Sequence, residues 1–174
     1  MSYANAQLAI EQRLANALVD IALLVVDGGD VSSADSGQVV DGGSPASSAS
    51  AVVLDGNAVL LVQWPNGPTI QPDGIAYAEV FHMPARTFVD TLGTTGQDLV
   101  PGVTQVDVYN PLATGNNMAA GVVDTFRASF KAGTWLTVSG QAVLVISCGP
   151  GPAHREGSYF KSIVTIEWEA RIAR

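Results

Sequence analysis

Runs of strand-forming residues that end at glycine or proline occupy most of the chain after residue 57. The runs rich in β-branched and aromatic residues predict strands over residues 58–64, 75–83, 102–111, 141–147 and 158–168. The clusters PNGP and GPGP, which end two of these runs, are turn signals because proline lacks a backbone donor and glycine tolerates unusual backbone angles. A chain with this pattern is constrained to build a sheet.

Alternation within the runs predicts which residues share a face of that sheet. The large residues of the second run lie on one face, and these are Tyr77, Phe81 and Met83. One face of the third run should contact the helix that follows, and it carries Thr104, Val106 and Val108. The last run has an apolar face of Phe160, Val164, Ile166 and Trp168. Residues 87–101 lack such a pattern, so we expect a loop with TLGTTG at its tip.

Two helices are expected beside the strands. A helical rhythm predicts the first over residues 5–24, with apolar positions at Leu8, Leu14, Leu18, Ile21 and Val25. The second has apolar residues every four positions, at Met118, Val122, Phe126 and Phe130. Its expected end signals are a cap at Thr114, Arg127 and Lys131 in the last turn, and Gly133. The predicted fold class is α+β, with a mixed or antiparallel sheet flanked by an N-terminal helix and a central helix.

Residues 27–57 differ in composition from the rest of the chain. They are rich in glycine, serine and aspartate, so they bury little apolar surface. The sequence VVDGG stands at 25–29 and again at 39–43, and Asp-Gly between valines is a turn signal between short strands. A flexible loop and a projecting β-arm both remain open. We therefore expect one domain overall, made of an N-terminal helix (1–26), this insertion (27–57) and an α/β core (58–174).

Charge is scarce and mostly negative. Only 14% of the 174 residues are charged and the net charge is -8. The usual charged fraction is about a quarter, so the low value favours a subunit whose surface is partly covered by other proteins. Residues 1–57 carry a net charge of -6. An acidic protein does not grip nucleic acid through its phosphates, because that contact depends on lysine and arginine.

Few residues suggest chemistry. Cys148 is the one cysteine, which excludes an intrachain disulfide and makes a reducing compartment of synthesis the default. Cys148 and His154 are six residues apart across a Gly-Pro turn, but no local signature of a thiol hydrolase accompanies them, so a Cys/His dyad is only a remote alternative. His82, at a strand end, is expected to be packed or hydrogen-bonded. We expect no catalytic residue, no metal site and no cofactor.

Other ligand sites are also disfavoured. Asp27, Asp30 and Asp35 invite a calcium site, but the required ligand positions hold Gly29, Val31 and Gln38. The tryptophans Trp64, Trp135 and Trp168 lie at or near the ends of elements, where we expect them to be buried in the core. The run IALLVV is far shorter than the roughly 20 residues that cross a bilayer. No signal peptide or membrane anchor is expected.

The order of motifs carries a resemblance to a known family. VQWPNGP is followed by a strand with Tyr77, and the loop 86–102 then leads to QVDVYNP. The helix GNNMAAGVVDTFRASF ends in KAG, and GPGPAHREGSYFKSIVTIEWEA follows it. In this order and spacing the chain resembles the tail-terminator-like proteins of long-tailed bacteriophages over about two thirds of its length.

The resemblance implies a small α/β domain whose copies close into a ring, usually of six, on the head-proximal end of the tail tube. It implies a structural virion protein of the neck, made in the host cytoplasm, with the tube protein and a head-completion or connector protein as partners. DNA would pass through without specific binding. It brings no catalytic residues. As channel or rim acids we expect Asp27, Asp30, Asp35 and Asp41; another neck protein or a tube subunit is the alternative.

Overall fold

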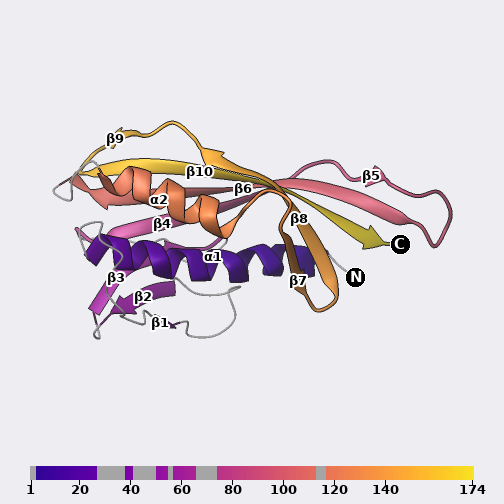
Figure 1. Ribbon diagram of the computed structural model, residues 1–174, viewed down its shortest axis with the longest axis horizontal. Helices are drawn as coiled ribbons and strands as arrows, with labels where there is room; N and C mark the ends of the chain where they lie inside the picture. The colour runs from indigo at the N-terminus through magenta and orange to yellow at the C-terminus, as the bar shows by residue number, and fades with distance from the viewer. Residues whose placement is uncertain (1–2, 27–37, 41–49, 55–56, 66–73, 113–116) are drawn as a thin grey trace.

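A computed structural model describes residues 3–26, 38–40, 50–54, 57–65, 74–112 and 117–174 (Figure 1). Two helices, α1 (Tyr3–Val26) and α2 (Asn117–Ser129), pack against one curled sheet and against each other. This arrangement confirms the predicted α+β fold class. Among the described residues no helix is long and apolar enough to cross a membrane.

The sheet is mixed and its central strands are long. Its order is β1-β2-β3-β4-β6-β10-β8-β7, while β5 pairs with β6 and β9 with β10. Every pairing is antiparallel except the one between β3 and β4. The bounds are β1 (Gln38–Val40), β2 (Ser50–Leu54), β3 (Asn57–Gln63), β4 (Ala76–Pro84), β5 (Phe88–Val89), β6 (Gln97–Pro111), β7 (Trp135–Val138), β8 (Gln141–Pro150), β9 (His154–Glu156) and β10 (Tyr159–Ala173).

The pair β6 and β10 forms the spine of the molecule. Each strand has 15 residues, and they pair without a break from Tyr159 opposite Pro111 to Ala173 opposite Gln97. At about 3.4 Å per residue such a ladder is roughly 50 Å long. One end carries the helices, and the other extends past them as a narrow projection (Figure 1).

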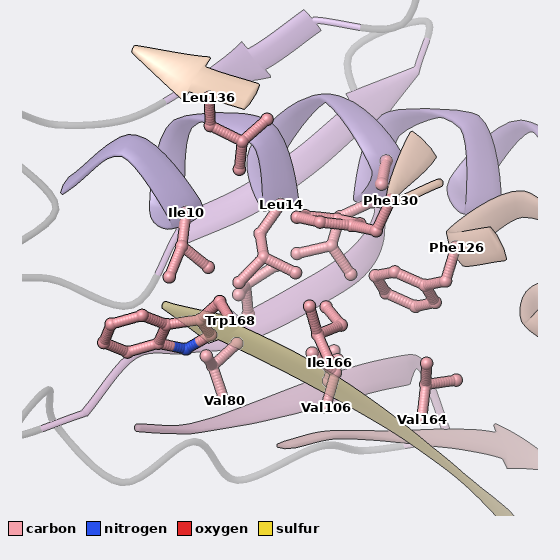
Figure 2. Packing of buried hydrophobic residues seen from close by; sticks show 14 of the residues in the cluster. Ile10, Leu14, Val80, Val106, Phe126, Phe130, Leu136, Val164, Ile166 and Trp168 are labelled. Atoms are coloured by element: carbon pink, nitrogen blue, oxygen red, sulfur yellow. The ribbon is translucent and has the colours of Figure 1, made fainter. Parts of the chain in front are cut away.

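The core lies between the helices and the inner face of the sheet. Helix α1 contributes Leu14 and Leu18, α2 contributes Phe126, and Phe130 directly follows α2; all four are nearly inaccessible to solvent. These side chains meet Val80, Val106, Val164, Ile166 and Trp168 from the sheet, and Figure 2 shows Phe126 and Phe130 above Ile166. The predicted apolar faces of the third and fifth runs are thus confirmed at these positions.

A hydrogen bond also links the middle of α1 to the end of α2. Arg13 of α1 donates from Nε to the carbonyl oxygen of Ser129, 3.0 Å away, at the end of α2. The last carbonyls of a helix lack partners within it, so this cation satisfies one of them and complements the helix dipole. After α2 the chain turns at Gly133, which has a φ of 83° and donates to the Val145 carbonyl of β8.

Several predicted boundaries are wrong: the strands are longer than predicted, and the second helix is shorter. The region 87–101 is not a loop, because β5 and the first part of β6 lie there, and β8 and β10 run on to Pro150 and Ala173. These extensions have partners far away in the sequence, so the local pattern alone does not set their length; β8 continues into the GPGP cluster and ends at Pro150. Helix α2 ends at Ser129, which leaves Lys131 beyond its last turn.

In residues 75–83 the large side chains share one face, as predicted, but this face is not the buried one. Tyr77, Phe81 and Met83 do share a face, but the buried face of β4 is the one with small residues, Ala76, Ala78 and Val80. Phe81 and Met83 remain 43% and 45% exposed. The small residues form the inner face of β4, and the large ones face outward.

Of the insertion predicted at 27–57, only 38–40, 50–54 and Asn57 are described. The first two segments form β1 and β2, which continue the sheet from the β3 edge. The remaining insertion residues lie outside the described part of the chain. The same holds for the predicted cap Thr114.

Close packing at Gly102 generates a stability prediction. A Cβ at Gly102 would overlap the indole ring of the buried Trp168, whereas a Cβ at Gly149 of β8 would meet nothing within 4 Å. We expect Gly102→Ala to lower the free energy of unfolding by about 1–3 kcal/mol, the usual cost of overpacking. Gly149→Ala is the matched control and should change it little. Urea unfolding followed by circular dichroism measures both, and equal effects would contradict the packing described here.

Candidate functional site: the arm and the edge hollow

The projecting end of the spine is the most exposed apolar part of the described chain. We call residues 85–101 and 169–174 the arm, which combines β5 with one end of β6 and of β10. Near its end, Phe88, Val89 and Leu92 are 54%, 60% and 95% exposed. We call these three residues the arm tip. Apolar side chains gathered at the end of a projection indicate a contact with another molecule.

The arm tip is held by an arginine clasp. Arg174 donates from Nε to Asp98 Oδ1 at 2.7 Å and from its terminal nitrogens to the carbonyls of Thr91 and Gly93. Arg171 pairs with Asp90 at 3.0 Å. The guanidinium group offers a rigid fork of donors, so one side chain can fix several acceptors of a turn. The clasp holds the turn between β5 and β6 against the end of β10.

The turn itself is closed by local bonds. The amide of Gln97 donates to Thr91 Oγ1 at 2.6 Å, and Gly96 donates to the Gly93 carbonyl. Gly93 has a φ of 109°, a conformation open to glycine and strained for other residues. Leu92 is therefore presented on a defined turn.

A second surface lies where β3 stops beside β4. The ladder between these strands ends at Gln63 and Glu79, so Val80–Pro84 have no strand partner on that edge in the described part of the chain. A hollow of about 740 Å³ follows this edge. We call it the edge hollow; its lining is Gln63, Trp64, Pro65, Glu79, Val80, Phe81, His82, Met83, Gln105 and Asp107.

Charges around the edge hollow are partly neutralised. Lys161 Nζ lies 2.8 Å from Asp107 Oδ2 and sits over the ring of Tyr109. Burial works to lower the pKa of Lys161, but hydrogen bonds with Asp107 and Tyr109 outweigh it and raise that pKa above its usual value. Glu79 accepts a longer hydrogen bond of 3.3 Å from the Tyr109 hydroxyl. Glu79 is therefore the acid of the hollow that no described cation neutralises.

His82 lies beneath the hollow in a structural role, as the sequence predicts. Its Nδ1 is 2.9 Å from Thr104 Oγ1, which also accepts from Trp168 Nε1 at 3.0 Å. An indole N–H only donates, so Thr104 is the acceptor in the bond with Trp168. The direction of the bond between Thr104 and Nδ1 depends on the imidazole tautomer. Nε2 faces Glu11 of α1 at 3.2 Å, outside hydrogen-bond geometry. His82 thus links α1 to the sheet.

The Cys/His alternative does not find support in the geometry. Cys148 aligns with Ile166 and His154 with Lys161 along the same edge of β10, five residues apart. At about 3.3 Å per residue this separates them by roughly 17 Å. Burial raises the pKa of Cys148 to about 11, against a smaller lowering effect of Arg127, so the thiol is protonated at neutral pH.

The other predicted site residues have different outcomes. Asp27, Asp30, Asp35 and Asp41 all lie outside the described residues. Trp64 and Trp168 are buried as predicted, whereas Trp135 is 54% exposed, so that prediction is wrong. Trp135 lies on β7, the last strand of the sheet, and alternates there with the buried Leu136. In the described part of the chain, no three His, Cys, Asp or Glu residues are placed to hold a metal ion.

Sequence reasoning missed the arm and the hollow for one reason. Both arise where strands distant in sequence end at different points along the spine, and no local pattern encodes this. A signal was nevertheless present, because Phe88, Val89 and Leu92 lie in an expected loop, where three large apolar residues are unusual.

The fold and these surfaces define a single-domain α+β protein equipped for contacts with other proteins. A family model described as phage tail terminator protein matches residues 49–168, and the chain belongs to this family of structural bacteriophage tail proteins. The suspected family is thereby confirmed. A solved structure described only by a sequence identifier is 19% identical, covers 95% of this chain and 96% of its own, and gives a TM-score of 0.58. This likeness shows a shared fold. No curated protein matches at a significant level.

The clasp predicts a local change in dynamics. We expect Arg174→Ala to raise hydrogen–deuterium exchange at the amides of residues 90–97, because the carbonyls of Thr91, Gly93 and Gln97 lose their contacts with the guanidinium group. The melting temperature should change little, since exposed ion pairs contribute only about 0–1 kcal/mol. Arg155→Ala, on exposed β9, is the control. Unchanged exchange over 90–97 in Arg174→Ala would show that the clasp does not hold the tip.

The burial and raised pKa of Cys148 predict slow alkylation of the folded protein. With a pKa of about 11, roughly one thiol in a thousand is ionised at pH 8, so iodoacetamide should label the folded protein slowly. Urea should restore the rate of a free cysteine. Labelling as fast in the folded as in the unfolded state, measured by mass spectrometry, would contradict this burial and reopen the thiol alternative.

Proposed function

We propose that this protein caps the tail tube as a ring, usually of six copies, at its head-proximal end. In this position it stops tube polymerisation and presents the surface that joins the head-completion or connector protein. The protein works through contacts between proteins and catalyses no reaction. The observation that carries the proposal is the membership of the tail terminator family over residues 49–168.

The described surfaces support an assembly role. The arm tip exposes three large apolar residues on a clasped turn, and the edge hollow leaves Phe81 and Met83 accessible. Surfaces of this kind are costly in a free monomer and stabilising once a partner covers them. The low charged fraction of the whole chain points the same way.

We further propose that DNA passes through the ring without specific binding. The acids Asp27, Asp30, Asp35 and Asp41 face the channel or its rim in this account, and their field repels phosphates in transit. The net charge of -6 on residues 1–57 is what supports this part of the proposal.

Loss of the protein should release the control of tube length. In cells infected by a phage that lacks this gene, we expect tubes longer and more variable than normal, without attached heads, because no ring blocks further addition. Expression of the wild-type chain from a plasmid should restore tails of normal length. Electron microscopy of lysates measures both. Tubes of normal length joined to heads, in the absence of the protein, would refute the proposal.

A further inference from the structure

We propose that the arm tip of one copy docks into the edge hollow of a second copy of this chain. Each subunit then gives its tip to one neighbour and its hollow to the other. This inference rests on the proposed ring and names the contact that closes it.

The tip cannot fill the hollow of its own chain. Both β4 and β5 pair with β6, where Val80 lies opposite Val106 and Phe88 opposite Leu99. These positions are seven residues apart along β6, which is about 23 Å at 3.3 Å per residue. The Arg174 clasp holds the tip in this extended position. A tip that enters such a hollow therefore belongs to another molecule.

The two surfaces match in polarity and in charge. The hollow of about 740 Å³ exposes the apolar Phe81 and Met83, and the tip offers apolar side chains of similar size. The exposed Arg86 at the base of the arm takes part in none of the ion pairs among the described residues. Glu79 gives the hollow the opposite charge. Such complementarity sets the partner and the register of an interface.

Both surfaces also have an open strand edge. In the described chain, β5 pairs with β6 alone, and β4 beyond Glu79 likewise pairs with β6 alone. Unpaired strand edges bind another strand through their backbone groups. A tip lying along β4 would satisfy both edges at once.

The contact has the geometry that a ring needs. The tip and the hollow are different surfaces of one chain, so their contact is heterologous, and heterologous contacts close into rings when the rotation between subunits allows it. A second copy is favoured over a different tail protein because each chain carries both halves of the match.

Cysteine cross-linking between full-length chains tests the contact. In a Cys148→Ser background, Leu92→Cys and Met83→Cys are made in separate chains, mixed, and treated with a short bismaleimide. Both sites are exposed, so the fold is retained. We expect the Leu92–Met83 product to exceed a matched control by roughly tenfold, because docking raises the effective concentration of the two thiols. The control pairs Leu92→Cys with Thr137→Cys, an exposed position on β7 at the far edge of the sheet.

A charge exchange separates specific docking from collision. Arg86→Glu in the Leu92→Cys chain should lower the yield, and Glu79→Arg in the Met83→Cys chain should restore it. A yield no higher than the control, or one that the exchange does not restore, overturns the inference. If microscopy still places a ring at the tail end, the proposed function stands without this contact. A specific product from a protein absent from tails supports the docking and refutes the proposed function.

Discussion

The unbroken pairing of β6 with β10 is the constraint on which the rest of the structure depends. Fifteen residue pairs join these strands. The ladder therefore sets the relative positions of the core at one end and of the arm at the other. At one end the inner face supplies Val106, Val164 and Ile166 to the core beneath the helices. At the other end the same ladder leaves the core and becomes the arm. A single interaction thus produces both the stable body and the projecting contact surface.

The division between body and arm is visible in the side chains along the ladder. Trp168 is 1% exposed and contacts Gly102 and Thr104, and the pair Ala170 and Val100 just beyond it is also buried. Beyond this pair, Arg171 and Arg174 bind the side chains and carbonyls of the arm. Hydrophobic packing therefore stabilises one end, and charge-assisted hydrogen bonds order the other.

Much of the body was predictable from the sequence, because its periodicity is local. The four-residue recurrence of Val122, Phe126 and Phe130 and the alternation of Val164, Ile166 and Trp168 each report a buried face directly. The arm was not predictable in this way. Residues 97–101 form a strand because β10 lies beside them, some 70 residues later in the chain. The exposure of Trp135 could not be predicted from the local sequence either. It lies on β7, the last strand of the sheet, and the strand order is set by pairings between distant segments.

In the function proposed above, this chain works as a ring at one end of the tail tube. Cryo-electron microscopy of isolated tails tests this most directly. We predict one ring at the head-proximal end, into which the α+β subunit fits with each arm reaching its neighbour. Density for the subunit repeated along the tube, or its absence from the tail, would contradict the account.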